Sequence, residues 1–155
     1  MACFLAVKGE TSRREDGRMD TVRKLDISDT MWEDVRGWGI NPLKISGMPD
    51  GRLLDLHVVS MRPGSERGNH YHPHAMERML VCGDHARTVW RSAGGEIHEI
   101  QTRSAGPTLL EISPDVEHAV KNESEREIYP VVLCNTSDPE TVRCAPLFAL
   151  RDEGE

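Results

Sequence analysis

The chain has 155 residues, of which 37% are hydrophobic and 29% are charged, and its formal net charge at pH 7 is −7. A chain of this length forms one domain, and we expect folding to bury about 70% of the surface that the unfolded chain exposes. The negative charge argues against nonspecific binding to nucleic acid or anionic membranes, because affinity for phosphates comes from clustered Lys and Arg. No apolar run approaches the length needed to cross a bilayer. The sequence therefore predicts no nucleic-acid partner and no membrane partner.

Residues 1–18 are predicted to form a mobile tail, because most of this segment is polar and has no periodicity. Residues 19–155 are predicted to form a single domain. Within it, residues 27–39 predict a short helix that is capped by Ser28 or Asp29 and anchored by two tryptophans.

From residue 52 onward the pattern changes to short apolar runs separated by turn residues. Turn signals such as Pro114-Asp115 stand between the runs. Regularly spaced short strands favour a β-sandwich or barrel over a parallel α/β sheet. We therefore predict an all-β protein, a single jelly-roll or similar β-barrel with a short N-terminal helix. The predicted strands cover residues 53–61, 77–82, 86–91, 97–103, 108–112, 118–121 and 128–135.

Cysteine usage indicates the cellular compartment. Cys3, Cys82, Cys134 and Cys144 contain no Cys-x-x-Cys pair, so we interpret them as reduced thiols. Cys82 and Cys134 lie in apolar runs, where a free cysteine usually acts as a small hydrophobic residue. The start of the chain has too short an apolar run for a secretory signal. We therefore expect a cytoplasmic protein.

One short segment carries most of the chemical information. It places His70, His72 and Glu77 within eight residues. Alternate residues of a strand point to the same face, so His70 and His72 can direct both rings at one point. A third imidazole, His118, follows in a later strand-like run. Three nitrogens and one carboxylate oxygen suit a divalent metal ion such as zinc, iron, nickel or manganese, and we predict these four residues as its ligands.

The spacing of these residues, with Gly64 before them and Gly83 after them, resembles the first conserved motif of the cupin superfamily. The run from residue 114 to Asn122 resembles the second motif, with Asp115 in place of the usual turn glycine. The resemblance covers about residues 50–137. It implies a single cupin jelly-roll β-barrel.

The phrase Arg-Gly-Asn-His-Tyr-His that ends at His72 is similar to cupins of nucleotide-sugar and capsular polysaccharide biosynthesis. The resemblance implies an isomerase- or epimerase-like enzyme that acts on a sugar or another small polyhydroxy molecule. Some of these cupins use the two histidines, here His70 and His72, as acid and base without a metal, whereas Glu77 favours a metal in this chain. Tyr129 is a further candidate for the catalytic acid.

Substrate binding is predicted at Arg62 and Arg67, which flank the first motif and can bind a phosphate or carboxylate through two N–H groups. The alternative is that both are solvated surface arginines.

Two other functions stay open, because one fold supports many chemistries. One is an iron- or nickel-dependent dioxygenase, since dioxygenase cupins use the same four ligands. The other is a non-enzymatic protein that binds a small ligand. All three functions imply a small-molecule ligand.

Exposed edge strands and the cupin resemblance also predict a homodimer. We expect the segment around Trp32 and Trp38 to contribute to its interface.

Overall fold

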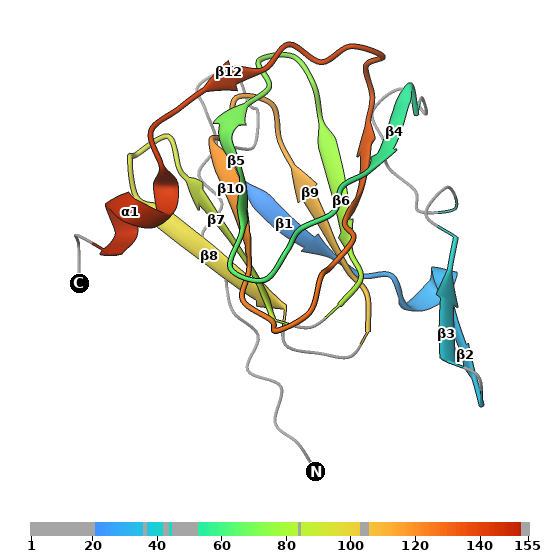
Figure 1. The fold of residues 1–155 in the computed structure, drawn as a ribbon. Helices are drawn as coiled ribbons and strands as arrows, with labels where there is room; N and C mark the ends of the chain where they lie inside the picture. Colours follow the sequence, from blue (N-terminus) through green and yellow to red (C-terminus); the bar gives the residue numbers. More distant parts are fainter. Residues whose placement is uncertain are drawn as a thin grey trace.

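The computed structural model describes residues 21–35, 37–41, 44, 53–83, 85–102 and 106–152, with residues 151 and 152 described by their backbone alone. The tail predicted for residues 1–18 lies outside the described residues. The described chain consists mainly of β-strands, and its single α-helix is short and lies near the C-terminus (Figure 1).

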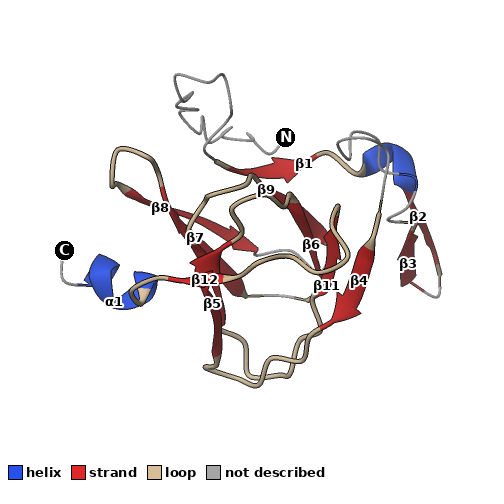
Figure 2. Cartoon of the chain, turned by 90° about the horizontal axis from the view of Figure 1, so that it is seen from above, coloured by secondary structure: helices blue, strands red, loops and turns tan. Residues whose placement is uncertain are grey.

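Two five-stranded antiparallel sheets form the body of the described part of the chain. In hydrogen-bonding order, the first sheet contains β1 (Val22–Leu25), β9 (Thr108–Ile112), β6 (Glu77–Val81), β11 (Val131–Cys134) and β4 (Asp55–Val58). The second sheet contains β12 (Val142–Arg143), β5 (Glu66–Tyr71), β10 (His118–Asn122), β7 (Ala86–Arg91) and β8 (Ile97–Thr102). Figure 2 shows the two sheets as facing layers.

The prediction of an all-β protein is confirmed for the described residues, apart from the short 3-10 turn and the C-terminal helix. Each strand expected after residue 52 is present, although several are shorter than predicted. The two sheets are separate, because no strand pair joins them among the described residues. They therefore form a sandwich of two sheets rather than the closed barrel that we predicted, and the jelly-roll assignment stays a prediction.

The predicted N-terminal helix is wrong. Residues Ser28–Thr30 form one turn of 3-10 helix, and a β-hairpin follows, made of β2 (Met31–Asp34) and β3 (Gly37–Ile40). Trp32 pairs with Gly39 across the hairpin, and a side chain at residue 39 would lie 2.3 Å from the Trp32 ring. The Trp32 ring thus occupies the space beside a glycine of the opposite strand. Packing between the two strands therefore determines the structure here, although the spacing of the tryptophans in the sequence is typical of a helix.

The hydrophobic core lies between the two sheets. Alternate residues of each strand point inward, so each sheet contributes one apolar face. The inward-facing side chains include Met79, Val81, Ala86, Trp90, Leu110, Ile112, Val120 and Val132.

The helix α1 (Leu147–Asp152) packs on the outer face of the second sheet. Its Leu147 and Phe148 are buried against Val89 of β7 and Ala119 of β10. Within the described residues, no helix is long and apolar enough to cross a membrane.

Candidate metal centre

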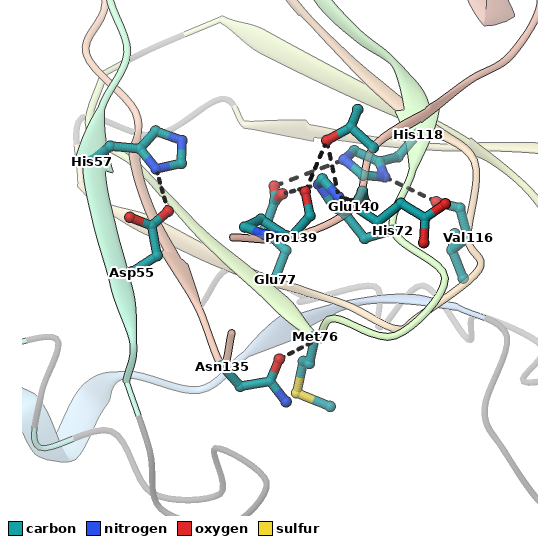
Figure 3. A network of polar contacts seen from close by, with 11 residues as sticks. Asp55, His57, His72, Met76, Glu77, Val116, His118, Asn135, Pro139 and Glu140 are labelled. Carbon is teal, nitrogen blue, oxygen red and sulfur yellow. Dashed lines mark hydrogen bonds and ion pairs between the residues drawn. The ribbon is translucent and has the colours of Figure 1, made fainter. Parts of the chain in front are cut away.

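The structure brings together all four residues that the sequence predicts as metal ligands. His70 and His72 lie at and just after the end of β5, Glu77 begins β6, and His118 begins β10. One ligand atom from each residue lies within 4.8 Å of the others. His72, Glu77 and His118 are buried, and His70 is partly buried. Figure 3 shows the side chains of His72, Glu77 and His118 pointing toward one another.

Backbone carbonyls orient two of the imidazole rings. Nδ1–H of His72 donates to the carbonyl of Glu140 at 2.8 Å, and Nδ1–H of His118 donates to the carbonyl of Val116 at 2.9 Å. Their Nε2 atoms lie 3.2 Å and 3.7 Å from the oxygens of Glu77. A carbonyl that accepts from one ring nitrogen fixes the ring and leaves the other nitrogen as the donor to a metal. Both rings therefore present Nε2 to the centre of the group.

A β-bulge places the third imidazole. Between β5 and β10, His70 pairs with His118 and Gly68 pairs with Ala119, so Asn69 is an extra residue in β5. Gly68 has φ of +101°, and a Cβ there would lie 2.7 Å from the carbonyl oxygen of His118. Only glycine fits this close approach of the two strands. The bulge thus depends on the Gly-Asn sequence that precedes His70.

The electrostatics of His70 and Glu77 favour the protonation states in which these two residues bind a metal. Burial, followed by the positive charges of His118 and His72, lowers the pKa of His70 from 6.5 to about 4. Burial alone would raise the pKa of Glu77, but the hydrogen bond from His72 and the neighbouring imidazoles hold it below its ordinary value. At neutral pH His70 is therefore neutral and Glu77 is a carboxylate.

The four residues line a cavity of about 490 Å³. This volume is within the range of small-molecule binding sites. Apolar side chains such as Met79 and Val132 line it together with Cys134, whose pKa burial raises to about 12. Its polar side chains include His57, Arg67, Thr141 and Arg143.

Two residues that the sequence predicts for the site lie outside the cavity lining. Tyr129 is 51% exposed, and its hydroxyl donates to Glu127 at 2.9 Å. Its neighbours Pro130, Val132 and Cys134 line the cavity, and strand alternation turns Tyr129 away from it. Arg62 is also exposed and does not line the cavity, whereas Arg67 does. Of the two predicted arginines, only Arg67 is placed to contact a ligand there.

Sequence reasoning missed an Asp–His pair and an arginine. His57, on the edge strand β4, lines the cavity, and its Nδ1–H donates to Asp55 at 2.8 Å (Figure 3). The spacing of Asp55 and His57 is the same i, i+2 spacing as that of His70 and His72 and is the signal that identifies the pair. Arg143 reaches the cavity because β12 pairs with β5, opposite His70. No motif near Arg143 indicates this placement.

Solved structures with a similar fold share little sequence with this chain. A variant of the 3,4-ketoisomerase QdtA from Thermoanaerobacterium thermosaccharolyticum, in complex with TDP-4-keto-6-deoxyglucose, matches with a TM-score of 0.63 and 15% identity over 85% of this chain and 92% of that chain. A 3,4-ketoisomerase from Helicobacter canadensis matches with a TM-score of 0.65 and 18% identity over 79% of this chain and 90% of that chain.

The capsular polysaccharide assembling protein CapF from Staphylococcus aureus matches with a TM-score of 0.53 and 21% identity. That match covers 59% of this chain and 26% of the CapF chain, so this chain matches about a quarter of CapF. At these identities the three likenesses show the fold alone.

A comparison with curated proteins gave no match. The family model described as the polysaccharide biosynthesis C-terminal domain matches residues 33–141, which is more than half of the chain. The chain therefore belongs to the family of polysaccharide biosynthesis C-terminal domains.

Proposed function

We propose that this chain is an isomerase or epimerase that acts on a sugar, or a similar polyhydroxy molecule, with a divalent metal ion. The observation that carries the proposal is the convergence of His70, His72, Glu77 and His118 on one cavity of small-molecule size. Membership of a polysaccharide biosynthesis family supports a sugar as the substrate. The fold that the chain shares with two sugar 3,4-ketoisomerases supports isomerisation as the reaction.

The four side chains fit a zinc ion or another divalent first-row metal. Neighbouring ligand atoms of a tetrahedral zinc site lie roughly 3.3 Å apart, since zinc–ligand bonds are about 2.0 Å long. The Glu77 oxygens lie 3.2 Å and 3.7 Å from the two Nε2 atoms, and all four ligand atoms lie within 4.8 Å of one another, so the group would contract around the ion to form such a site. An ion held there would supply Lewis-acid polarisation of a substrate oxygen.

Isomerisation of a keto-sugar requires a group that takes a proton from the hydroxyl-bearing carbon beside the carbonyl and delivers a proton to the former carbonyl carbon, while the hydroxyl proton passes to the former carbonyl oxygen. Epimerisation requires the proton to be returned to the same carbon from the other face. We assign this role to His57. Asp55 accepts its Nδ1–H, which leaves Nε2 with a lone pair that can accept a proton from the substrate. His57 lines the cavity and Tyr129 does not, so His57 replaces Tyr129 as the proposed acid or base.

Two guanidinium groups in the cavity suit an anionic substrate. Arg67 and Arg143 both line it, in a protein whose net charge is −7. Guanidinium groups bind phosphate oxygens through paired N–H donors. Together with the nucleotide-sugar bound to QdtA, this supports a sugar linked to a nucleoside diphosphate as the substrate.

The metal is tested by elemental analysis of the purified protein. We expect about one divalent ion per chain in the wild type and none in the His70→Ala, His72→Ala double variant, because two of the four ligands are lost. Stoichiometric metal in the double variant would contradict the assignment of the ligands.

The reaction is tested by incubation with TDP-4-keto-6-deoxyglucose and its UDP counterpart in D₂O. Mass spectrometry should detect deuterium in the sugar, with a rate that falls after treatment with a chelator. The His57→Gln variant should be slower by about 100-fold or more, as expected for loss of a general base. The Tyr129→Phe variant is the matched control and should exchange at the wild-type rate.

The same measurements distinguish the other two functions. Bound iron, together with oxygen uptake and no deuterium exchange, would indicate a dioxygenase and not an isomerase. Tight binding of the nucleotide-sugar with neither exchange nor oxygen uptake would identify a ligand-binding protein.

A further inference from the structure

We infer that Asn69 is a positioning residue that couples the C-terminal segment 139–147 to the metal ligands. The inference rests on the proposed function, since it concerns how the chain holds the four ligands in place. Asn69 itself contacts neither the substrate nor the metal in this assignment. Its side chain and backbone instead fix the bulge that determines where His70 points.

The bulge sets which side chains of β5 face the cavity. Arg67 pairs with Val120 and His70 pairs with His118, and paired residues of antiparallel strands point to the same side. Arg67 and His70 are three positions apart, so in a regular strand they would point to opposite faces. Because Asn69 is an extra residue, both line the cavity. One inserted residue therefore brings an imidazole and a guanidinium group to the same site.

The C-terminal segment holds Asn69 from two sides. The side-chain oxygen of Asn69 accepts a hydrogen bond from the backbone N–H of Leu147 at 2.9 Å. Its backbone carbonyl accepts one from the N–H of Cys144, also at 2.9 Å. Asn69 has φ of +54°, a conformation that asparagine and glycine adopt more readily than other residues. The bulge is thus tied to the beginning of α1.

The C-terminal segment that makes these two hydrogen bonds is held in place by packing on the outer face of the second sheet. Leu147 and Phe148 are buried against Val89 and Ala119, on the side of the second sheet that faces away from the cavity. Docking of α1 therefore fixes the position of the Leu147 N–H group, which donates to the side chain of Asn69.

The same segment orients the second imidazole. The carbonyl of Glu140 accepts the Nδ1–H of His72, and β12 pairs with β5 through Val142 and Tyr71. The segment between Pro139 and Leu147 thus supports both His70, through the bulge, and His72, directly. Removal of the Asn69 side-chain amide should therefore weaken the support of His70, while all four ligand residues remain present.

The test compares Asn69→Gly with Asn69→Asp. Glycine tolerates the positive φ and removes the acceptor of the Leu147 bond, whereas aspartate keeps an acceptor oxygen in the same place. Zinc affinity is measured by competition with a chromogenic chelator. The visible absorption of the cobalt-loaded protein reports the coordination geometry. Thr102→Val is the matched control, because it removes the acceptor of the Ala86 N–H outside the cavity lining.

We expect Asn69→Gly to weaken zinc binding by about 10-fold or more and to change the cobalt spectrum, as losses of supporting groups around a metal do. The zinc affinity of Asn69→Asp should stay within about 3-fold of the wild-type affinity, because aspartate keeps the acceptor oxygen. The metal-free Asn69→Gly protein should melt no lower than metal-free Thr102→Val, whose zinc affinity should be unchanged.

Wild-type affinity in Asn69→Gly, or equal losses in Asn69→Gly and Asn69→Asp, would overturn the positioning role while the metal site stands. An equal loss of affinity in Thr102→Val would also overturn it, since the effect would then follow from general destabilisation. If the wild type binds neither zinc nor cobalt, the proposed metal-dependent function and this inference both fail.

Discussion

Glu77 and its three histidine neighbours form a buried group whose protonation states depend on one another. The pKa of His70 is lowered to about 4, whereas that of His72 is raised by its bonds to Glu77 and to the Glu140 carbonyl, which outweigh its burial. Glu77 stays ionised because the imidazoles surround it. In the metal-free protein at neutral pH, a neutral His70 imidazole therefore lies beside the hydrogen-bonded pair of His72 and Glu77.

The lowered pKa of His70 predicts acid sensitivity of the metal-free protein. Between pH 6.5 and about pH 4 the unfolded chain binds a proton at His70 that the folded protein does not bind. The free energy of unfolding should therefore fall as the pH is lowered through this window. The contribution of His72 to the pH dependence has the opposite sign, since its raised pKa stabilises the folded protein below pH 6.5.

A comparison of the wild type with His70→Asn isolates the contribution of His70. Urea unfolding of chelator-treated protein at pH 7, 5.5 and 4.5 should show a larger loss of stability on acidification in the wild type than in the variant. Equal pH dependence of the two proteins would contradict a lowered pKa for His70.

At the scale of single elements, α1 carries more of the structure than its six residues suggest. Phe148 is 3% exposed and packs with Leu147 on the second sheet. Its ring also lies 5.1 Å from the guanidinium carbon of Arg87 and 5.5 Å from Nζ of Lys121. Apolar burial and two cation–π contacts thus hold the helix on the sheet.

We therefore predict that Phe148→Ala lowers the free energy of unfolding by about 3–5 kcal/mol, the usual cost of truncating a buried phenylalanine. The control Phe148→Leu keeps most of the apolar volume and should cost less than about 1.5 kcal/mol. Urea denaturation followed by circular dichroism measures both. An unchanged midpoint for Phe148→Ala would show that α1 is not held by this side chain.

The hairpin of β2 and β3 shows which elements local sequence patterns do not predict. Its tryptophans have helix-like spacing, but the structure depends on the pairing of Trp32 with Gly39, a contact between two strands. By contrast, most strands of the two sheets after residue 52 were predictable, because turn residues mark their ends, whereas β1 and β12 were not predicted.

For the site, the four clustered ligands follow from strand alternation and residue spacing, which are local properties of the sequence. The placement of Tyr129 relative to the cavity depends instead on the register of β11, and that of Arg143 depends on the pairing of β12 with β5. The bulge at Asn69 reverses the alternation on which such predictions rest. Register and bulges arise from contacts between distant segments, so the sequence alone did not place these residues.

At the scale of the whole molecule, exposed apolar side chains lie on the β2–β3 hairpin and along the edge strand β4. Trp32 is 59% exposed, and Leu54, Leu56 and Val58 form a half-exposed row along β4, an edge strand of the first sheet in the described chain. Edge strands with apolar side chains tend to pair with other chains. This surface supports the predicted homodimer.

We expect light scattering to give twice the chain mass of 17.4 kDa for the wild type. The Trp32→Lys, Leu56→Lys double variant should give the monomer mass, because it places two charges on the proposed interface. Leu150→Lys changes an exposed leucine on α1, which Figure 1 shows on the opposite side of the molecule from the hairpin, and should remain dimeric. A monomeric wild type at micromolar concentration would refute the dimer.

The ligands come from both layers of the sandwich: Glu77 begins a strand of the first sheet, and the three histidines belong to or follow strands of the second. Since no strand pair joins these sheets in the described chain, an ion bound by all four residues would form a cross-link between them. A ligand that binds only the folded state stabilises it by about 2.7 kcal/mol at a free concentration 100 times its Kd. Occupancy of the centre would then be a thermodynamic property of the whole sandwich, and the unfolding temperature of the protein would rise with the concentration of free metal.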